Sequence, residues 1–197
     1  MNQKRQWAFQ LSVPNIVLLV SALAINILGK WVSGCFSLPF WLDTVGTIFA
    51  AGILGPFAGV LVGGISGCLN AAFASVTAIY AVTGICVGLV VGYFYQEDAL
   101  DLFQILCSGA IVAISAVLVT TPVNIIYYSG YTQNLWGDAL IDMMLQGGNS
   151  RLFSYVLGEA LVDIPDKVIS VFFAAGAEKV WCRFYPAGKK GAVNDEK

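Results

Sequence analysis

The chain has 197 residues, of which 58% are hydrophobic and only 11% are charged, and its mean hydropathy is +0.78. Because a soluble domain is on average about 25% charged, this composition excludes an ordinary cytosolic domain, a disordered chain and a nucleic-acid-binding module, which needs a basic excess. The net charge of -2 adds no strong pull towards anionic partners, and the composition indicates an integral membrane protein.

Long uncharged stretches divide the chain into candidate membrane-spanning helices. Spanning a bilayer takes about 20 apolar residues, and the spacing of charges, prolines and glycines predicts six segments: 15–33, 44–54, 57–73, 77–95, 102–128 and 153–181. The second is short for a span, so it is tilted, partly interfacial, or continuous through a bend with the third. We therefore predict an all-α fold. It is a single six-helix transmembrane domain over 1–197, with short cytoplasmic tails at 1–14 and 183–197.

Basic residues beyond the first and last segments set the predicted orientation. These residues are Lys4, Arg5, Arg183, Lys189 and Lys190. Since Lys and Arg favour the cytoplasmic side, both termini are predicted to be cytoplasmic, in a multi-pass protein of a prokaryotic plasma membrane. The acidic loop at 97–98 would lie on the same side, which weighs mildly against this orientation. The first apolar run continues into an equally apolar chain, so we interpret it as a retained helix rather than a cleaved signal peptide.

Small residues repeat every four positions in the third and fourth segments. The glycines concerned are Gly55, Gly59, Gly63 and Gly67, followed by Gly84, Gly88 and Gly92. This spacing lines one helix face, where glycine lets another backbone approach closely. The pattern favours tight packing of the two helices within the bundle, and the alternative is a surface that slides against a partner subunit.

The densest group of charges inside an apolar segment lies between residues 158 and 167. Glu159, Asp163 and Lys167 share one helix face at four-residue steps, whereas Asp166, about 100° away from Lys167, is expected to face elsewhere. Charges within membrane helices are rare and usually functional. Two compatible interpretations are an internal Asp163–Lys167 ion pair that offsets the cost of burial and a polar floor for a ligand.

Further polar and aromatic side chains surround these charges. Asp43 has the chemistry of an N-cap for the second segment. Isolated polar groups inside the helices either satisfy a neighbouring helix or face a site: Asn70, Thr77, Tyr80, Thr83 and Asn124. The aromatic residues at the outer helix ends form either a membrane-interface belt or, together with the loop at 129–152, a lid over a planar ligand. The predicted ligand-binding residues are Trp41, Asp43, Asn70, Tyr80, Asn124, Tyr128, Trp136, Arg151, Glu159, Asp163 and Lys167.

The sequence lacks the residues that several kinds of functional site require. The chain has no histidine, and no two of its five cysteines have metal-ligand spacing, so we predict no metal, no cofactor and no catalytic residue. An intramembrane aspartyl protease using Asp43 and Asp163 is an alternative, but the Gly-x-Gly-Asp context of that chemistry is missing. There is no Walker motif, so any dependence on ATP must come from partners.

Two strings in the first half of the chain resemble a known family. They are LPFWLDTVGTIFAA (38–51) and LGPFAGVLVG (54–63). Together with the chain length, the six predicted spans, the Gly-Pro-x-x-Gly turn and the polar patch of the last segment, they resemble the S components of energy-coupling factor (ECF) transporters. These are six-helix membrane proteins that bind vitamins or related micronutrients.

The resemblance implies capture of a substrate rather than catalysis. The ligand would bind on the outer side, and the protein would then dock on a transmembrane T component that carries two ATPase subunits. In the family an Ala-x-x-x-Ala-like face of the first helix contacts the T component. Here that helix has no such pair but offers Ser21, Ala22 and Ala24, and Gly59 and Gly63 of the third segment are the alternative docking residues.

The chemistry of the candidate residues narrows the class of ligand but does not identify the compound. Acidic, amide and aromatic groups with one or two cations suit a planar, polar and roughly neutral compound such as a flavin, a pteridine or a modified base. The alternative function is a membrane sensory or scaffold module that transports no metabolite. Such a module needs a sizeable cytoplasmic surface, and the predicted tails are short.

Overall fold

A computed structural model describes residues 11–73, 78–94 and 102–185. The described residues form seven α-helices and one 3₁₀ turn and contain no strand, so the all-α prediction is confirmed. The elements are α1 (Val13–Phe36), α2 (Val45–Leu54), α3 (Pro56–Phe73), η1 (Ala78–Tyr80), α4 (Ala81–Phe94), α5 (Leu102–Tyr128), α6 (Leu135–Gln146) and α7 (Arg151–Phe184). Thr77, the loop at 97–98 and all the basic residues used for orientation except Arg183 lie outside the described residues.

The predicted segments match the observed helices, apart from their ends and one added helix. α5 has the predicted bounds, whereas α1 and α7 each extend further in both directions, and α4 begins only after η1. The added helix is α6, which lies inside the stretch predicted as a loop, so that prediction is wrong. With 12 residues, α6 rises about 18 Å and is too short to cross a bilayer.

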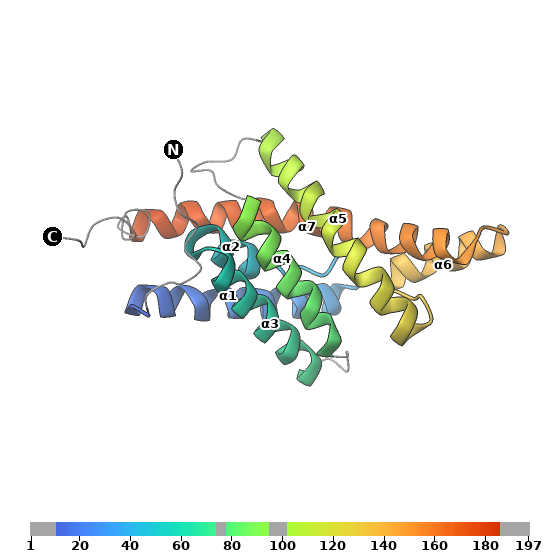
Figure 1. Ribbon diagram of the computed structural model, residues 1–197, viewed down its shortest axis with the longest axis horizontal. Helices are drawn as coiled ribbons and strands as arrows, with labels where there is room; N and C mark the ends of the chain where they lie inside the picture. Colours follow the sequence, from blue (N-terminus) through green and yellow to red (C-terminus); the bar gives the residue numbers. More distant parts are fainter. Residues whose placement is uncertain (1–10, 74–77, 95–101, 186–197) are drawn as a thin grey trace.

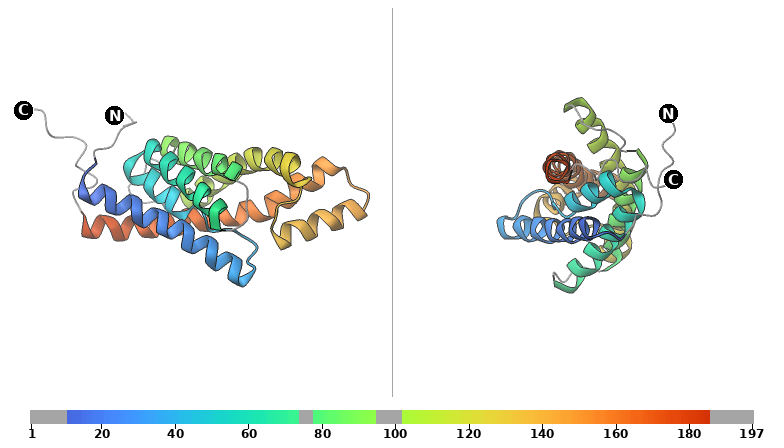
Figure 2. Two further views of the ribbon diagram at one scale, coloured as in Figure 1. Left: turned by 90° about the horizontal axis from the view of Figure 1, so that it is seen from below. Right: turned by 90° about the vertical axis from the view of Figure 1, so that its left-hand side faces the viewer.

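α1 and α7 run along the length of an elongated bundle, and α3, α4 and α5 cross it obliquely (Figure 1). α1 begins and α7 ends at the same end of the molecule (Figure 1). At the opposite end, α6 folds back along the first part of α7 (Figures 1 and 2). α3 packs against α4, and α5 packs against α7.

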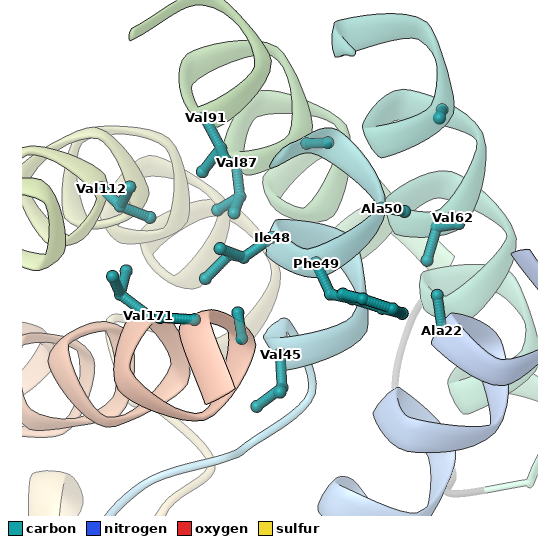
Figure 3. Packing of buried hydrophobic residues seen from close by; sticks show 14 of the residues in the cluster. Ala22, Val45, Ile48, Phe49, Ala50, Val62, Val87, Val91, Val112 and Val171 are labelled. Atoms are coloured by element: carbon teal, nitrogen blue, oxygen red, sulfur yellow. The ribbon is translucent and has the colours of Figure 1, made fainter. Parts of the chain in front are cut away.

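α2 occupies the centre of the bundle, where residues 45–51 are all buried. Its Ile48 and Phe49 belong to an apolar cluster to which five other helices contribute (Figure 3). α2 ends at Gly55, whose φ of 90° is one that glycine adopts without strain, and Pro56 then starts α3. The second predicted segment is therefore a short helix enclosed by its neighbours and separated from α3 by a break.

The two glycine series face each other across the α3–α4 contact. A Cβ atom at Gly63 would lie 2.2 Å from the Gly84 carbonyl oxygen, and one at Gly59 would lie 2.8 Å from the Cα of Gly88. Close packing within the bundle is therefore confirmed. Gly59 and Gly63 face inward, so a partner could dock on them only if α3 and α4 parted.

The outer surface carries many apolar side chains. Two described stretches, Val13–Phe36 and Ile105–Tyr128, are long and apolar enough to cross a membrane. On α5, for example, Leu118 and Ile126 are 70% and 73% exposed. An extensive apolar surface is typical of contact with lipid or with a partner. These features give a coarse indication of membrane association.

A polar contact inside the apolar core ties the first three helices together. Asn26 of α1 is fully buried. Its amide nitrogen donates to the hydroxyls of Thr47 and Ser66, each at 2.9 Å, and its oxygen accepts from the Gly46 backbone N–H at 2.7 Å. Every hydrogen of the amide group is used, so the asparagine fixes the relative positions of α1, α2 and α3.

Replacing Asn26 with leucine is expected to destabilise the protein, because the Gly46 N–H and two hydroxyls lose their partner. Each buried group left unpaired costs about 1–3 kcal/mol. Thermal unfolding in detergent measures the effect. Ser21→Ala, at a half-buried position of the same helix, is the control and should change stability little. An Asn26→Leu protein as stable as the Ser21→Ala protein would contradict this role.

Candidate functional site

A cavity lies among the helices inside the bundle. Its volume is about 80 Å³. The lining residues are Lys30, Trp41, Asp43, Thr44, Gly63, Ser66, Gly67, Asn70, Tyr80, Thr83, Gly84, Thr120, Thr132, Gln133, Glu159, Asp163 and Lys167. The wall therefore combines acidic, basic, hydroxyl, amide and aromatic groups with glycines.

The positions of these residues along the helices show how the bundle assembles the cavity. α1 and α5 contribute lining residues from their second halves and α3 from its middle onward, whereas α4 contributes at its beginning and α7 in its first half. Trp41, Asp43 and Thr44 come directly before α2. Along the chain, the helices thus contribute to the cavity alternately from their C-terminal and N-terminal parts. Such an alternation is expected when consecutive helices run in opposite directions, as in an up-and-down bundle.

Glu159 is held by a chain of hydrogen bonds from two other elements. The Tyr80 hydroxyl donates to the side-chain oxygen of Asn124, and the Asn124 amide nitrogen donates to Glu159 Oε2 at 2.6 Å. The Tyr80 ring stacks on Tyr128, with ring centroids 5.6 Å apart. Glu159 is only 2% exposed, so these contacts orient a buried carboxylate that lines the cavity.

Lys167 forms the centre of a buried charge cluster on α7. Its Nζ lies 3.7 Å from Asp163 Oδ1 and 2.5 Å from Asp166 Oδ2, so the predicted Asp163–Lys167 pair is confirmed. The expectation that Asp166 faces elsewhere is wrong, because the long lysine side chain reaches the carboxylate of its neighbour. Asp166 Oδ1 also accepts from the backbone N–H groups of Trp41 and Leu42, at 3.0 and 2.7 Å.

A second, less buried ion pair also lines the cavity. Lys30 Nζ is 3.5 Å from Asp43 Oδ2 and stands 3.3 Å from the ring centroid of Trp41. The predicted N-cap role of Asp43 is wrong, since Thr44 occupies the cap position of α2 and makes no capping hydrogen bond with its side chain. Asp43 instead joins the segment before α2 to α1, and a cation–π contact adds to that connection.

Two segments cover the cavity, residues 37–44 and residues 129–134, and α6 ties them together. The Asn134 side chain donates to the Leu38 carbonyl at 3.1 Å, and Trp136 Nε1 donates to the Ser37 carbonyl at 2.9 Å. Tyr131 donates to Asp142 of α6 at 2.7 Å, which raises the pKa of the Tyr131 hydroxyl. α6 and these two segments together form the cover of the cavity.

The covering segments hold strained backbone. Four non-glycine residues among those described have a positive φ: Ser37, Leu42, Ser129 and Gln133. All four lie in the two covering segments. Ser37 is the C-cap of α1 and Ser129 directly follows α5, and helices commonly end in this conformation. Leu42 and Gln133 lie within the segments themselves, where such a backbone costs about 1–3 kcal/mol each. At Leu42 the hydrogen bond to Asp166 holds the strained backbone in place.

Most of the predicted ligand-binding residues meet at this cavity. Seven line it: Trp41, Asp43, Asn70, Tyr80, Glu159, Asp163 and Lys167. Asn124 and Tyr128 stand behind them, in contact with Tyr80. Trp136 and Arg151 are exposed and outside the lining, although Trp136 secures the cover. Of the predicted docking residues on α1, Ala22 is fully buried, Ser21 is half-buried and Ala24 is exposed.

Sequence reasoning missed several lining residues. They are Lys30, Thr44, Ser66, Gly67, Thr83, Gly84, Thr120, Thr132 and Gln133. Lys30 carried a usable signal, because it is the one charge between residue 6 and Asp43 in an otherwise apolar stretch. The hydroxyl and glycine positions carried none, since the same residue types also line ordinary contacts between membrane helices.

Comparison of the chain with protein-family models, with curated proteins and with solved structures finds no match. The case for a function therefore depends on the geometry of the cavity and on the residues quoted above.

Proposed function

We propose that the chain is a substrate-binding membrane subunit similar to the S components of ECF transporters. It would capture a planar, polar, vitamin-like compound from the outer side and deliver it through a T component and two ATPase subunits. The observation that carries this proposal is the cavity itself. Buried charged, amide and aromatic groups from nearly every long helix converge there beneath a strained cover.

Both strings that resemble the family contribute to the cavity lining, the first through Trp41, Asp43 and Thr44 and the second through Gly63. Residues 38–51 form most of one covering segment and the first part of α2, and residues 54–63 form the break and the first half of α3. Five of the seven helices line the cavity, and α2 begins directly after the lining residues Trp41, Asp43 and Thr44. Their alternating directions support an up-and-down bundle with both termini on one side. α6 is the seventh, and it belongs to the cover.

The size of the cavity and the segments that cover it indicate how a ligand would enter. Sites for vitamin-sized ligands are typically about 300–1,000 Å³, so such a ligand needs more room than the interior volume of about 80 Å³ provides. Outward movement of the covering segments would supply this room. Breaking the Trp136–Ser37 and Asn134–Leu38 hydrogen bonds would free them, and their return would close the site over the ligand.

The exposed face of α1 offers the docking surface for the T component. Val20, Ala24 and Leu28 recur at four-residue spacing, and all three are exposed. Val20 and Leu28 are each 60% exposed. A stripe of this kind packs against another membrane helix. Gly59 and Gly63 are not needed for this docking, because they already pack against α4.

Capture of a metabolite by purified protein tests the proposal. The protein is extracted in detergent without ATP, and the small molecules released on denaturation are identified by mass spectrometry. We expect one saturable planar compound, and its uptake into proteoliposomes should require the T component, the ATPases and ATP. Recovery of a protein partner with no bound metabolite would contradict the proposal and favour a sensory or scaffold role.

A further inference from the structure

The charges in and against the cavity do not balance. Four carboxylates face two ammonium groups: Asp43, Glu159, Asp163 and Asp166 against Lys30 and Lys167. Lys30 is paired with one carboxylate, and Lys167 is shared by two. Among the described residues no cation lies within ion-pair distance of Glu159. With all six groups ionised, two negative charges are left without a counter-charge.

A second observation shows an acceptor that is not used. Asp163 is 3% exposed, and its Oδ2 has no hydrogen-bond partner among the described residues. Asp163 and Glu159 stand one turn apart on the same face of α7, and both line the cavity. A buried carboxylate oxygen without a donor is costly. The site therefore needs a hydrogen-bond donor, and a positively charged donor would suit it best.

The part of the cavity wall that α3 and α4 form suits a flat group. Gly63, Gly67 and Gly84 line it, and Cβ atoms at these positions would point into the contact between the two helices. The cavity is therefore lined there by helix backbone, against which a ring can lie. The Tyr80 ring, fixed by its stacking on Tyr128, adds an aromatic group beside this wall.

We propose that the ligand of this cavity is a planar organic cation. Its ring lies along the glycine wall, and its positively charged nitrogen donates hydrogen bonds to Glu159 and Asp163. This inference rests on the proposed function and differs from the roughly neutral ligand that the sequence suggests. A proton on Glu159 would also reduce the excess charge, but it would leave the cavity without a preference among ligands of different charge.

Three probes of one shape and different charge test this preference. Benzamidine is cationic, benzamide is neutral and benzoate is anionic, and all three share a flat framework. Their affinities for the full chain in detergent are measured by ligand-observed NMR and by thermal shift. We expect benzamidine to bind at least about tenfold more tightly than either of the others, which is a readily measured difference. Equal binding of the three, tighter binding of benzamide or benzoate, or no benzamidine binding at about 10 mM would overturn the proposal.

Variants that remove the charge of one carboxylate at a time show which residues cause the preference for a cationic probe. Glu159→Gln keeps an oxygen that can accept from Asn124 but removes the charge, and it should abolish most of the tenfold selectivity. Asp163→Asn is a second variant that should weaken benzamidine binding in the same direction. Glu178→Gln, about three turns beyond Lys167 on the same helix and outside the cavity lining, is the matched control and should keep full selectivity. Unchanged selectivity in both cavity variants would overturn the assignment.

Failure of this inference differs from failure of the proposed function. If the purified protein carries a neutral metabolite and shows no preference for benzamidine, capture stands and the cationic ligand is wrong. If benzamidine selectivity depends on Glu159 but no metabolite is captured or transported, the charge preference of the site stands and the transport role is wrong.

Discussion

Lys167→Met is expected to lower the free energy of unfolding by about 3–5 kcal/mol, the cost of leaving a buried charge without its partner. The lysine side chain is 3% exposed and holds the carboxylates of Asp163 and Asp166. Methionine has a similar length, so the packing changes little and the charge is the main loss. Because Asp166 also fixes Trp41 and Leu42, the covering segment should loosen as well.

Thermal unfolding in detergent measures this effect, and a fall in Tm of about 10 °C is expected for a chain of this size. Lys179→Met, at an exposed position of the same helix, is the matched control and should leave Tm nearly unchanged. The triple variant Asp163→Asn, Asp166→Asn, Lys167→Met removes the whole cluster. The asparagine introduced at position 166 would still offer an oxygen to the two backbone N–H groups, so most of the lost stability should return. A triple variant less stable than Lys167→Met alone would show that charge compensation is not the cause.

The helical architecture could be predicted because it depends on local features of the chain. Long uncharged stretches mark the positions of the helices, and α5 has the predicted bounds for this reason. Glycines at four-residue spacing lie on one face of a helix, where they let another backbone approach closely. This pattern therefore predicted the close contact of α3 with α4. Each of these inferences needs only the sequence near the residues concerned.

α6 was missed because its polar residues were interpreted as loop residues. Asp138, Asp142 and Gln146 recur every four positions, which places them on one face of a helix. Asn134 directly before Leu135 is an N-cap signal, and its side chain does accept from the Trp136 N–H. The periodicity was therefore present in the sequence. The division of the chain into long apolar segments assigned this short, polar stretch to a loop.

The partners of the charged residues could not be predicted from spacing alone. Asp43 has the sequence position of a cap, but Lys30 reaches it from a helix whose register relative to α2 is set by tertiary packing. Asp166 was placed away from Lys167 by helix geometry, yet the lysine side chain is long and flexible enough to turn towards it. Sequence patterns predict which charges are buried, whereas tertiary packing determines which of them meet.

The residues of the cavity also divide into those that the local sequence predicts and those that only tertiary packing brings there. Glu159, Asp163 and Lys167 could be selected because charges in an apolar helix are costly and rarely retained without a role. Thr120 could not, because its contact with Thr83 at 3.1 Å depends on how α4 and α5 cross. Trp136 was selected for its aromatic ring. The structure instead uses its N–H to fasten the cover.

Gly63→Ala is expected to destabilise the protein by about 1–3 kcal/mol, the usual cost of overpacking a close contact, even though alanine favours helix over glycine. The added Cβ would lie 2.2 Å from the Gly84 carbonyl oxygen and 2.4 Å from its carbonyl carbon. Both atoms belong to the backbone, so no side-chain movement can relieve the overlap. α3 and α4 must separate, and the flat wall of the cavity must change shape with them.

Gly64→Ala provides a matched control one position along the same helix. Its Cβ would meet only the Ile85 side chain, at 3.4 Å, so the variant should be neutral or slightly more stable through helix propensity. Comparing the two by thermal unfolding in detergent separates the cost of close approach from any general effect of alanine in α3. Benzamidine affinity gives a second comparison, since only Gly63 lines the cavity. Equal stability and equal affinity of the two variants would mean that α3 and α4 are not in backbone contact, and the glycine wall would then have no basis.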